Sequence, residues 1–402
     1  MTPTSTSAAL GERIHIDIRA IERELNDLWK QLAEDANGEK QQAVTRTCVL
    51  NLIVVTGGGR AAEHATETIA RLTERHPNRA FVISAAPHAR KDVLDAWVQT
   101  HCQMPSPGRP QVCGEQISIL ARGAAVDRVA GTLLPLLVPD VPVMLWWPRG
   151  EPAGDPRFLK FADIVDRVIV DSATFAAPEA GLARMAALLD PDPPTSAAGA
   201  GARGDYDGGP SGTGAAISDL SWSRLTPWRE LTAQFFDAPS LAPHLAEITR
   251  VVVDYEARAG KAADRSQALL LVGWLAARLG WRTAGPPSEQ PDGTTLRLAS
   301  AIGEPIAVEL RPATSGDDAL DRLAALAIEC RRARFMIARD DTPDCAVARS
   351  EIAGMQPIQR KVRLERLDEA DLIGEELRLL GHDQTFEAVL KVTAGLIAQA
   401  AG

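Results

Sequence analysis

The feature that most constrains the fold is an alternation of short apolar runs with amphipathic segments between residues 47 and 172. The apolar runs are rich in valine, isoleucine and leucine, as are strands that are buried on both faces of a parallel sheet. Strands that alternate with helices form a mostly parallel sheet. We therefore predict an α/β domain over residues 41–190. Its predicted strands are 47–56, 79–86, 115–123, 141–147 and 167–172, and its predicted helices are 60–76, 90–101, 124–138, 155–166 and 177–189.

The second half of the chain follows a different pattern, in which apolar and polar residues alternate one by one. That period is typical of antiparallel strands with one face toward solvent. We predict an α+β domain over residues 218–402, with largely antiparallel strands and two C-terminal helices that separate near Gly381. The predicted strands are 248–255, 294–301, 305–313, 333–339 and 345–353, and the predicted helices are 225–237, 264–281, 317–332 and two within 368–399.

Two further segments complete the domain organisation. Residues 191–217 consist mainly of Gly, Ala, Pro, Ser and Asp, and they lack the large apolar side chains that offset the entropy of ordering a chain. We predict a flexible linker there. In residues 1–40, apolar residues recur at spacings of three and four between positions 10 and 33. This spacing predicts an amphipathic helix whose apolar side packs on another part of the protein.

The composition excludes several functional classes. The net charge is −10, from 53 acidic and 43 basic residues, and the basic residues are dispersed along the chain. We therefore expect no binding to nucleic acid, which requires a basic patch. The longest apolar runs are too short, or too interrupted by proline, to span a bilayer. Because the N-terminus also lacks the features of a secretory signal, we expect a cytoplasmic protein without a membrane segment.

One glycine cluster could bind an anion. Gly57, Gly58 and Gly59 lie between a predicted strand and a predicted helix, and Arg60 follows them. Backbone N–H groups at such a helix start suit a phosphate group. The cluster matches neither the Gly-x-Gly-x-x-Gly motif nor the phosphate loop that ends in Lys-Ser or Lys-Thr. The alternative is an ordinary tight turn between strand and helix.

The cysteines and histidines indicate no metal site. The five cysteines are widely spaced and include no Cys-x-x-Cys pair, so we expect no disulfide framework and no zinc site. Cys48 and Cys330 lie in apolar runs, where cysteine usually behaves as a small hydrophobic residue. Cys330 and Cys345 flank a predicted strand and could approach each other. The metal-ligand candidates that share a neighbourhood without suitable spacing are His88, His101, Cys102 and Cys113.

No catalytic arrangement is recognisable either, since the chain has no Gly-x-Ser-x-Gly elbow and none of its seven histidines lies in a triad context. The segment after the predicted linker instead interleaves Trp222, Arg224, Trp228 and Arg229. Tryptophan and arginine dominate the binding energy of protein interfaces, so we predict a partner-binding site there. The alternative is that Trp228 belongs to the core face of a helix.

A second aromatic feature ends the predicted strand at 141–147. Trp146 and Trp147 are adjacent, so they face opposite sides of the sheet if the strand continues to Trp147. Both faces of a parallel sheet are normally buried, which makes the pair a core feature first. Arg149 follows Pro148 at the carboxyl edge of the strand. Trp146, Trp147 and Arg149 are our second set of candidate partner-binding residues.

Several sequence blocks together resemble the glucose-6-phosphate dehydrogenase assembly protein family, also called OpcA. The blocks are RTCVLNLIVV, VCGEQISIL, LLPLLVPDVPVMLWWPRG, DRVIVDS and DLSWSRLTPWRELTAQFFD. The likeness covers most of residues 10–400, apart from the Gly- and Ala-rich tract. It implies a non-catalytic cytoplasmic protein without cofactors that binds glucose-6-phosphate dehydrogenase and favours its active oligomer. It would thereby control NADPH production in the oxidative pentose phosphate pathway.

The resemblance also implies redox control through cysteines in photosynthetic members, but the C-terminal helical segment of this chain contains no cysteine. One alternative function remains open. Ligands of parallel α/β sheets bind beyond the carboxyl ends of the strands. The loops expected at that edge supply several His and Arg residues, so the chain could bind a sugar phosphate or a nucleotide itself. A purely structural scaffold is a third possibility.

Overall fold

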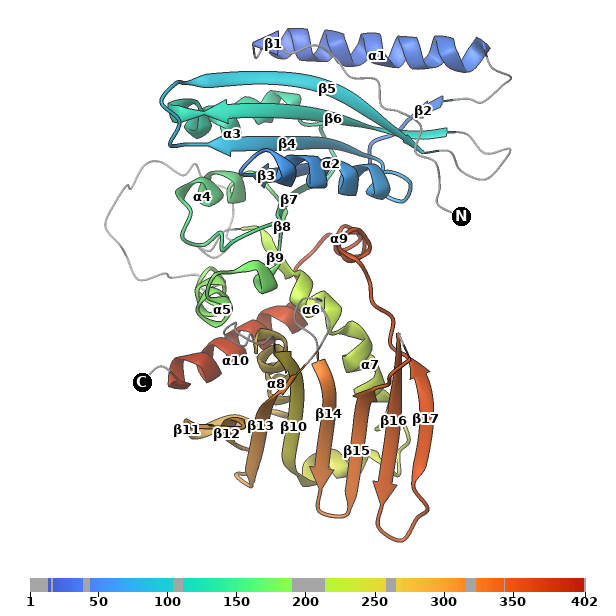
Figure 1. Ribbon diagram of the computed structural model, residues 1–402, viewed down its shortest axis with the longest axis vertical. Helices are drawn as coiled ribbons and strands as arrows, with labels where there is room; N and C mark the ends of the chain where they lie inside the picture. The colour runs from blue at the N-terminus through green and yellow to red at the C-terminus, as the bar shows by residue number, and fades with distance from the viewer. Residues whose placement is uncertain are drawn as a thin grey trace. The chain divides into compact units, whose positions relative to one another are not determined.

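The computed structural model describes residues 14–15, 17–38, 44–103, 111–189, 214–257, 265–314, 323–342 and 344–400 (Figure 1). The chain divides into two compact units, each made of several segments. Unit 1 comprises Met1–Asp171, Thr213–Ser218 and Asp368–His382, and unit 2 comprises Ser172–Gly212, Asp219–Leu367 and Asp383–Gly402. Most of the linker predicted at 191–217 lies outside the described residues.

Unit 1 is built on a sheet, here called sheet A, whose strands follow the order β1-β5-β6-β4-β3-β7-β8-β9, with β2 paired to β6. The pairs that β3 forms with β4 and β7 are parallel, as are β4–β6, β2–β6 and β7–β8. The strand β5 departs from this arrangement, because it pairs antiparallel with β1 and β6. The strands are β1 (Ile14–His15), β2 (Val44–Arg46), β3 (Leu50–Thr56), β4 (Asn78–Ala86), β5 (Val93–Gln103), β6 (Gln111–Arg122), β7 (Val143–Trp147), β8 (Arg167–Val170) and β9 (Ala216–Asp219).

The strand order of sheet A reverses next to β3. From β3 the chain proceeds to β4 and then β6 on one side, and it returns to place β7, β8 and β9 on the other side. This doubly wound arrangement is the order found in dinucleotide-binding sheets. Every residue of β3 is buried, as expected for a strand at the centre of a covered parallel sheet. The reversal places the carboxyl ends of β3 and β7 side by side.

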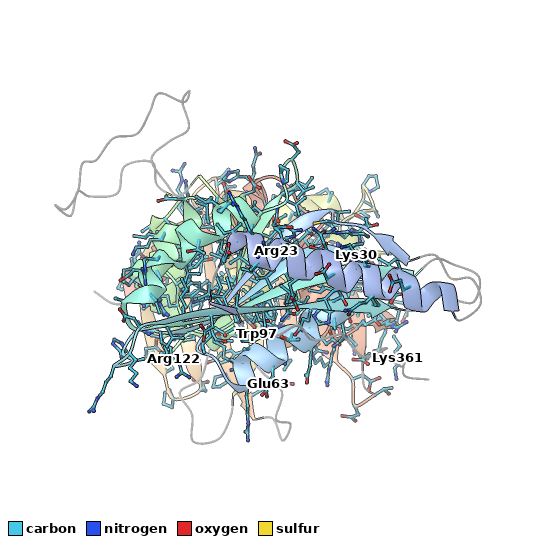
Figure 2. The ribbon with its side chains drawn as sticks, turned by 90° about the horizontal axis from the view of Figure 1, so that it is seen from above. Arg23, Lys30, Glu63, Trp97, Arg122 and Lys361 are labelled. Carbon is cyan, nitrogen blue, oxygen red and sulfur yellow. A yellow bond between two sulfur atoms is a disulfide. The ribbon has the colours of Figure 1, made fainter. Side chains whose placement is uncertain are left out.

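Helices cover both faces of sheet A. Trp29 of α1 donates a hydrogen bond to Glu115, whereas Thr66 of α2 accepts one from Gln116. Neighbouring strand residues point to opposite faces, so α1 and α2 lie on opposite faces, as Figure 2 shows for Arg23 of α1 and Glu63 of α2. The helices of unit 1 are α1 (Ile18–Gly38), α2 (Arg60–Leu72), α3 (Val129–Leu133), α4 (Pro156–Ala162) and α9 (Glu369–Glu376), with 3-10 turns η1 (Gly123–Arg128) and η2 (Leu134–Leu136).

Unit 2 is built on a second sheet, sheet B, with the strand order β11-β12-β13-β10-β14-β15-β16-β17. Only β10 and β13 pair in parallel, and the other neighbours are antiparallel. The predicted fold class is therefore confirmed for both halves of the chain. The strands are β10 (Ile248–Ala257), β11 (Arg282–Gln290), β12 (Gly293–Ala299), β13 (Pro305–Thr314), β14 (Leu323–Cys330), β15 (Ala333–Arg339), β16 (Cys345–Ile352) and β17 (Ile358–Arg363).

The helices of unit 2 form a layer in which α10 packs on both α5 and α8. Gly273 of α8 allows this close approach, because a Cβ atom there would lie 2.3 Å from the Thr393 hydroxyl of α10. The predicted separation of the C-terminal helices near Gly381 is confirmed, since α9 ends before it and α10 begins after it. The helices are α5 (Pro178–Ala187), α6 (Leu220–Arg224), α7 (Thr226–Gln234), α8 (Ser266–Leu279) and α10 (Gln384–Ala400), with 3-10 turns η3 (Ser172–Thr174) and η4 (Ala242–Glu247).

Two predicted helices are strands. The segment 90–101 contributes β5, which pairs with β6 residue by residue from Val93 to Gln103. The segment 317–332 contributes β14, which lies between β10 and β15. Both segments are short apolar runs whose periodicity fits a helix or a strand equally well. Pairing with distant strands decided between the two, and such pairing leaves no local signal in the sequence.

Candidate functional site

The glycine cluster after β3 forms the turn that leads into α2. Gly58 and Gly59 have positive φ angles of 85° and 57°, a backbone region that glycine adopts without strain. The Gly58 N–H donates a hydrogen bond to the Thr56 hydroxyl, and Gly59 caps the start of α2. Gly57, Gly59 and Ala62 also have the Gly-x-Gly-x-x-Ala spacing, a variant of the dinucleotide-binding turn. The turn therefore has the backbone shape expected of a phosphate-binding loop.

A cavity of about 350 Å³ lies beside this turn, at the carboxyl ends of β3 and β7. Arg60 from the first turn of α2 and Arg149 from the loop after β7 line the same cavity. Both side chains are exposed, and neither makes a hydrogen bond or ion pair within the described part of the chain. The structure thus brings together two residues that were predicted separately, one as an anion ligand and one at the edge of the Trp146–Trp147 strand.

The remaining charged groups at the cavity are paired. His64 of α2 and Glu369 of α9 both line the cavity and contact each other through Nε2 and Oε2. Two further ion pairs join these helices, Arg71 with Asp368 and Arg75 with Asp371. The Arg71 hydrogen bond helps to lower the pKa of Asp368, against the opposing effect of burial. The acidic start of α9 is therefore held against α2, and Glu369 contacts His64.

The tryptophans before Arg149 belong to the core of unit 1. Trp146 is fully buried and stands opposite Val54 in the register of β7 and β3. Trp147 is also buried and packs edge-to-face on Phe158 of α4, with ring centroids 5.8 Å apart. Both indole rings thus fill the interior, and Arg149 is the exposed residue of this predicted set. Their role in partner binding stays a prediction.

The segment predicted to bind a partner forms α6 and α7 in unit 2. Trp222 and Trp228 are buried. The Trp222 ring stacks on Phe386, and its indole N–H donates a hydrogen bond to Asp383. Arg229 lies over the Trp222 ring, with its guanidinium carbon 3.4 Å from the ring centroid.

Arg224 and Arg229 are half-buried, so they are the members of the predicted set that reach the surface of unit 2. The buried tryptophans act as a support that orients this surface. Partner binding by Trp222, Arg224, Trp228 and Arg229 remains a prediction.

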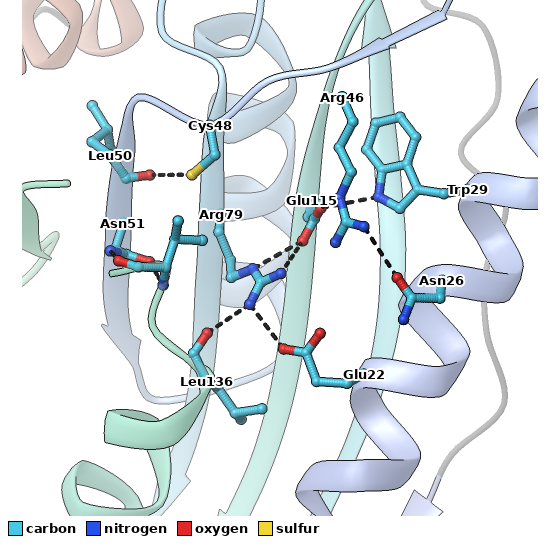
Figure 3. Close-up of polar contacts among 11 residues, drawn as sticks. Glu22, Asn26, Trp29, Arg46, Cys48, Leu50, Asn51, Arg79, Glu115 and Leu136 are labelled. Atoms are coloured by element: carbon cyan, nitrogen blue, oxygen red, sulfur yellow. Dashed lines mark hydrogen bonds and ion pairs between the residues drawn. The ribbon is translucent and has the colours of Figure 1, made fainter. Parts of the chain in front are cut away.

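A buried ionic network beneath α1 was not anticipated from the sequence (Figure 3). Glu115 of β6 accepts hydrogen bonds from Trp29, Arg46 and Arg79. Arg79 also donates to Glu22 of α1 and to the Leu136 carbonyl oxygen. Buried charges are tolerated only when paired in this manner. The network helps to dock α1 on sheet A, together with the buried apolar side of that helix.

A second buried charge, that of Arg167, binds the segment around α9. Arg167 of β8 is fully buried and donates hydrogen bonds to the Ser218 hydroxyl and to the carbonyl oxygens of Leu379 and Gly381. Glu376 lies 3.7 Å from its guanidinium group. The role of Arg167 was not predicted from the sequence, because the only signal there is a single arginine at the start of an apolar strand. These contacts hold residues 376–381 against sheet A within unit 1.

The cysteine predictions require correction. Cys102 and Cys113 form a disulfide, with Cα atoms 4.2 Å apart, because the β5–β6 pairing places them directly opposite each other. The helix predicted over 90–101 concealed this register. Cys330 and Cys345 do not approach each other, since β14 and β16 run in the same direction and these residues lie at opposite ends of them.

Burial raises the pKa of Cys330 to about 12, so this thiol is unreactive at neutral pH. Within the described residues, no group of three or more His, Cys, Asp or Glu side chains is arranged to hold a metal ion. Of the candidate metal ligands, Cys102 and Cys113 are bonded to each other. His101 is buried and lies 2.8 Å from the Gln116 amide oxygen, and burial lowers its pKa.

None of the described helices combines the length and apolarity that crossing a bilayer requires.

The fold and the cavity define a class of protein: a doubly wound α/β unit with a cavity at its strand-order reversal, joined to a mostly antiparallel sheet unit. Models of a particular family match both halves. The glucose-6-phosphate dehydrogenase subunit N-terminal domain matches residues 69–187, and the C-terminal domain of the same subunit matches residues 215–390. The chain belongs to the glucose-6-phosphate dehydrogenase assembly protein (OpcA) family.

Cyanobacterial relatives support this assignment. The putative OxPP cycle protein OpcA of Nostoc punctiforme is 28% identical over 361 residues, which cover 84% of this chain and 71% of that protein. The protein of the same name from Synechocystis sp. is 26% identical over 333 residues, covering 80% of this chain and 64% of that protein. These names support a role in the oxidative pentose phosphate pathway.

Solved structures are more distant. A putative oxidoreductase from Klebsiella pneumoniae has 12% sequence identity and a TM-score of 0.47, over 89% of this chain and 94% of that one. A match at this level of similarity carries no information about the activity of the chain.

Proposed function

We propose that the chain is a non-catalytic partner of glucose-6-phosphate dehydrogenase that binds the enzyme and favours its active oligomer. The observation that carries this proposal is the match of two domain models of one dehydrogenase subunit family, in order, to residues 69–187 and 215–390. The family name describes an assembly protein rather than a catalyst. A role in the cytoplasm, at the entry to the oxidative pentose phosphate pathway, follows from the proposed partner.

The proposed mechanism is a shift of equilibrium. A protein that binds the active oligomer more tightly than the inactive form moves the population toward the active oligomer, by an amount set by the difference between the two affinities. Such an effector needs a surface with a few strong contacts and needs no acid, base or nucleophile. In unit 2 the α6–α7 surface, formed by Arg224, Arg229 and the exposed residues of α7, has this character.

The supporting contacts give this surface a defined shape. Arg229 is held over Trp222 and donates a hydrogen bond to the Thr226 hydroxyl. An arginine that is already ordered loses little entropy when it binds a partner. Trp222 is in turn fixed by Asp383 and Phe386 of the segment that contains α10. We propose that these packed aromatics position Arg224 and Arg229 for the dehydrogenase.

The test mixes the full chain with the dehydrogenase of the same organism. Oligomer mass is measured by analytical ultracentrifugation, and the glucose 6-phosphate dependence of activity is measured in the same samples. We expect the chain to increase the larger oligomer and to change the kinetics in parallel. Unchanged mass and unchanged kinetics, with disulfides both intact and reduced, would refute the proposal.

A matched pair of variants locates the contact. In Arg224→Glu/Arg229→Glu the α6–α7 surface carries reversed charge, and we expect at least a tenfold loss of affinity for the dehydrogenase, as at an interface hot spot. Arg278→Glu/Arg282→Glu is the control with the same change of charge, because both are exposed arginines of the same unit, on α8 and β11. Both proteins must keep the wild-type melting temperature within a few degrees. Equal loss in the control would show that the effect is one of overall charge.

A second candidate function, binding of a phosphorylated small molecule by the chain itself, is favoured by a different observation: the cavity lined by Arg60 and Arg149.

A further inference from the structure

The cavity between the ends of β3 and β7 has an unusual electrostatic lining. Arg60 and Arg149 come from different loops, share one cavity of about 350 Å³, and have no ionic partner in the described part of the chain. Two like charges in one cavity raise the electrostatic energy of the protein unless an anion lies between them. Elsewhere in unit 1, Arg79 and Arg167 are satisfied by several hydrogen bonds each. The two exposed guanidinium groups are therefore available to bind an anion.

The cavity occupies the place where this kind of sheet binds ligands. In a doubly wound sheet, ligands lie outside the carboxyl ends of the strands, at the point where the strand order reverses. In sheet A that point is the boundary between β3 and β7. The lining includes Thr56 and Gly57 from the end of β3 and Pro148 from the end of β7. Position and charge are independent observations, and they coincide.

A neighbouring cavity shows that the positive lining is specific. It has a similar size, about 360 Å³, and lies along a different side of α2. Its lining includes Glu63 and Glu67 together with Trp97, and no arginine or lysine. Figure 2 labels Glu63 and Trp97 there. A phosphate would be repelled from that cavity, whereas the β3–β7 cavity attracts it.

We propose that the β3–β7 cavity binds the phosphate or diphosphate group of a small phosphorylated metabolite, with Arg60 and Arg149 as its cationic ligands. The two arginines outnumber the one carboxylate at the cavity, that of Glu369, which contacts His64. The glycine turn leaves room beside the anion, since nothing lies within 4 Å of where a Cβ of Gly57 or Gly59 would stand. This inference concerns the isolated chain and does not rest on its partnership with the dehydrogenase.

The residues after β4 narrow the ligand chemistry. Dinucleotide sheets that hold a ribose hydroxyl usually do so with an Asp or Glu about 20 residues beyond the glycine turn. The end of β4 and the following loop, residues 84–91, contain no Asp or Glu and instead contain His88, Arg90 and Lys91. This loop therefore lacks the acidic side chain that would bind a ribose hydroxyl, and recognition of a phosphate group is favoured.

Binding of pyrophosphate to the full chain, measured by isothermal titration calorimetry at constant ionic strength, tests the proposal directly. We expect saturable binding, and we expect Arg60→Ala and Arg149→Ala each to weaken it about tenfold or more, because each removes a charge-assisted hydrogen bond. Arg23→Ala is the matched control, an exposed arginine of α1 in the same unit, and it should bind pyrophosphate like the wild type. All the arginines involved are exposed, so the variants should fold.

Displacement experiments identify the source of the phosphate. If NADP⁺ binds and pyrophosphate displaces it, the ligand is a nucleotide; if glucose 6-phosphate competes instead, the ligand is a sugar phosphate. Either result supports the proposal. Absence of pyrophosphate binding, or equal weakening in Arg23→Ala, overturns it. Because no dehydrogenase is present in these measurements, their failure would leave the proposed dehydrogenase partnership standing.

Discussion

Sheets A and B differ in how deeply their charged residues are buried and in how those residues are paired. Sheet A contains charged residues that are buried within its strands and bonded to several partners, as are Arg167 and Glu115. In sheet B they are half-exposed and pair across neighbouring strands, as when Arg250 of β10 binds Glu309 of β13 and Glu329 of β14. A parallel sheet covered on both faces can leave free charges only at strand ends, and Arg60 and Arg149 lie there. A sheet with an accessible face can carry them along its strands.

The largest expected effect comes from the most buried charge. Arg167→Ala should lower the free energy of unfolding of unit 1 by about 3–5 kcal/mol, because it removes the guanidinium group from the buried Glu376 and Ser218 and deletes two hydrogen bonds to carbonyl groups. Urea unfolding, monitored by hydrogen exchange of the β8 backbone amides, measures this loss of stability. Arg334→Ala, on the half-exposed face of sheet B, is the control and should cost less than about 1 kcal/mol. Similar losses in the two variants would remove the contrast between the sheets.

An intermediate effect concerns pH and unit 1. Burial lowers the pKa of His101, and burial likewise lowers that of His76. The unfolded chain therefore binds protons that the folded unit excludes, so stability falls as the pH drops below about 6.5, by up to about 1.4 kcal/mol per pH unit for the buried His101 and by less for the half-exposed His76. We expect His101→Gln to flatten the stability profile of unit 1 between about pH 6.5 and 5. An unchanged slope in this variant would mean that His101 does not contribute.

The smallest effect is expected in sheet B. The hydrogen bond from Arg250 lowers the pKa of Glu309, so this pair stabilises unit 2 above the ordinary glutamate pKa of about 4.3 and is lost as the pH falls below it. Glu309→Gln should cost less than about 1 kcal/mol at pH 7, because the pair is accessible to solvent. Chemical denaturation of unit 2 in low and high salt checks this. A loss of several kcal/mol would place Glu309 among the buried charges, with those of sheet A.

The sequence predicted most of the fold because strands and helices carry local patterns. The apolar runs at β3, β4, β7 and β8 and the alternation in β12, β13, β15 and β16 were read from periodicity alone. The segments 90–101 and 317–332 failed because their periodicity is ambiguous and their strand partners are far away in the chain. The Cys102–Cys113 disulfide was missed for the same reason, since it depends on the register of β5 against β6.

The candidate site was predicted only in pieces. The sequence showed both parts of the site: the glycine turn with Arg60, and Arg149 after the two tryptophans. It contains no signal that Arg60 and Arg149 line the same cavity. The partners of Arg79 and Arg167 could not be predicted either. A single charged residue in an apolar run does not indicate which distant residues will bind it. Trp222 and Trp228 looked like interface residues, and the structure places both indole rings in the interior of unit 2.

By itself, the sequence determined most of the helices and strands, the two fold classes and the family, since periodicity and ordered blocks of residues are properties of the chain. Only the tertiary structure decided the order of the strands. That order made β5 and β14 strands, joined Cys102 to Cys113, and brought Arg60 beside Arg149. The physical reason is that the free energy of a strand or a buried charge depends on partners distant in sequence, and those partners are chosen when the chain packs.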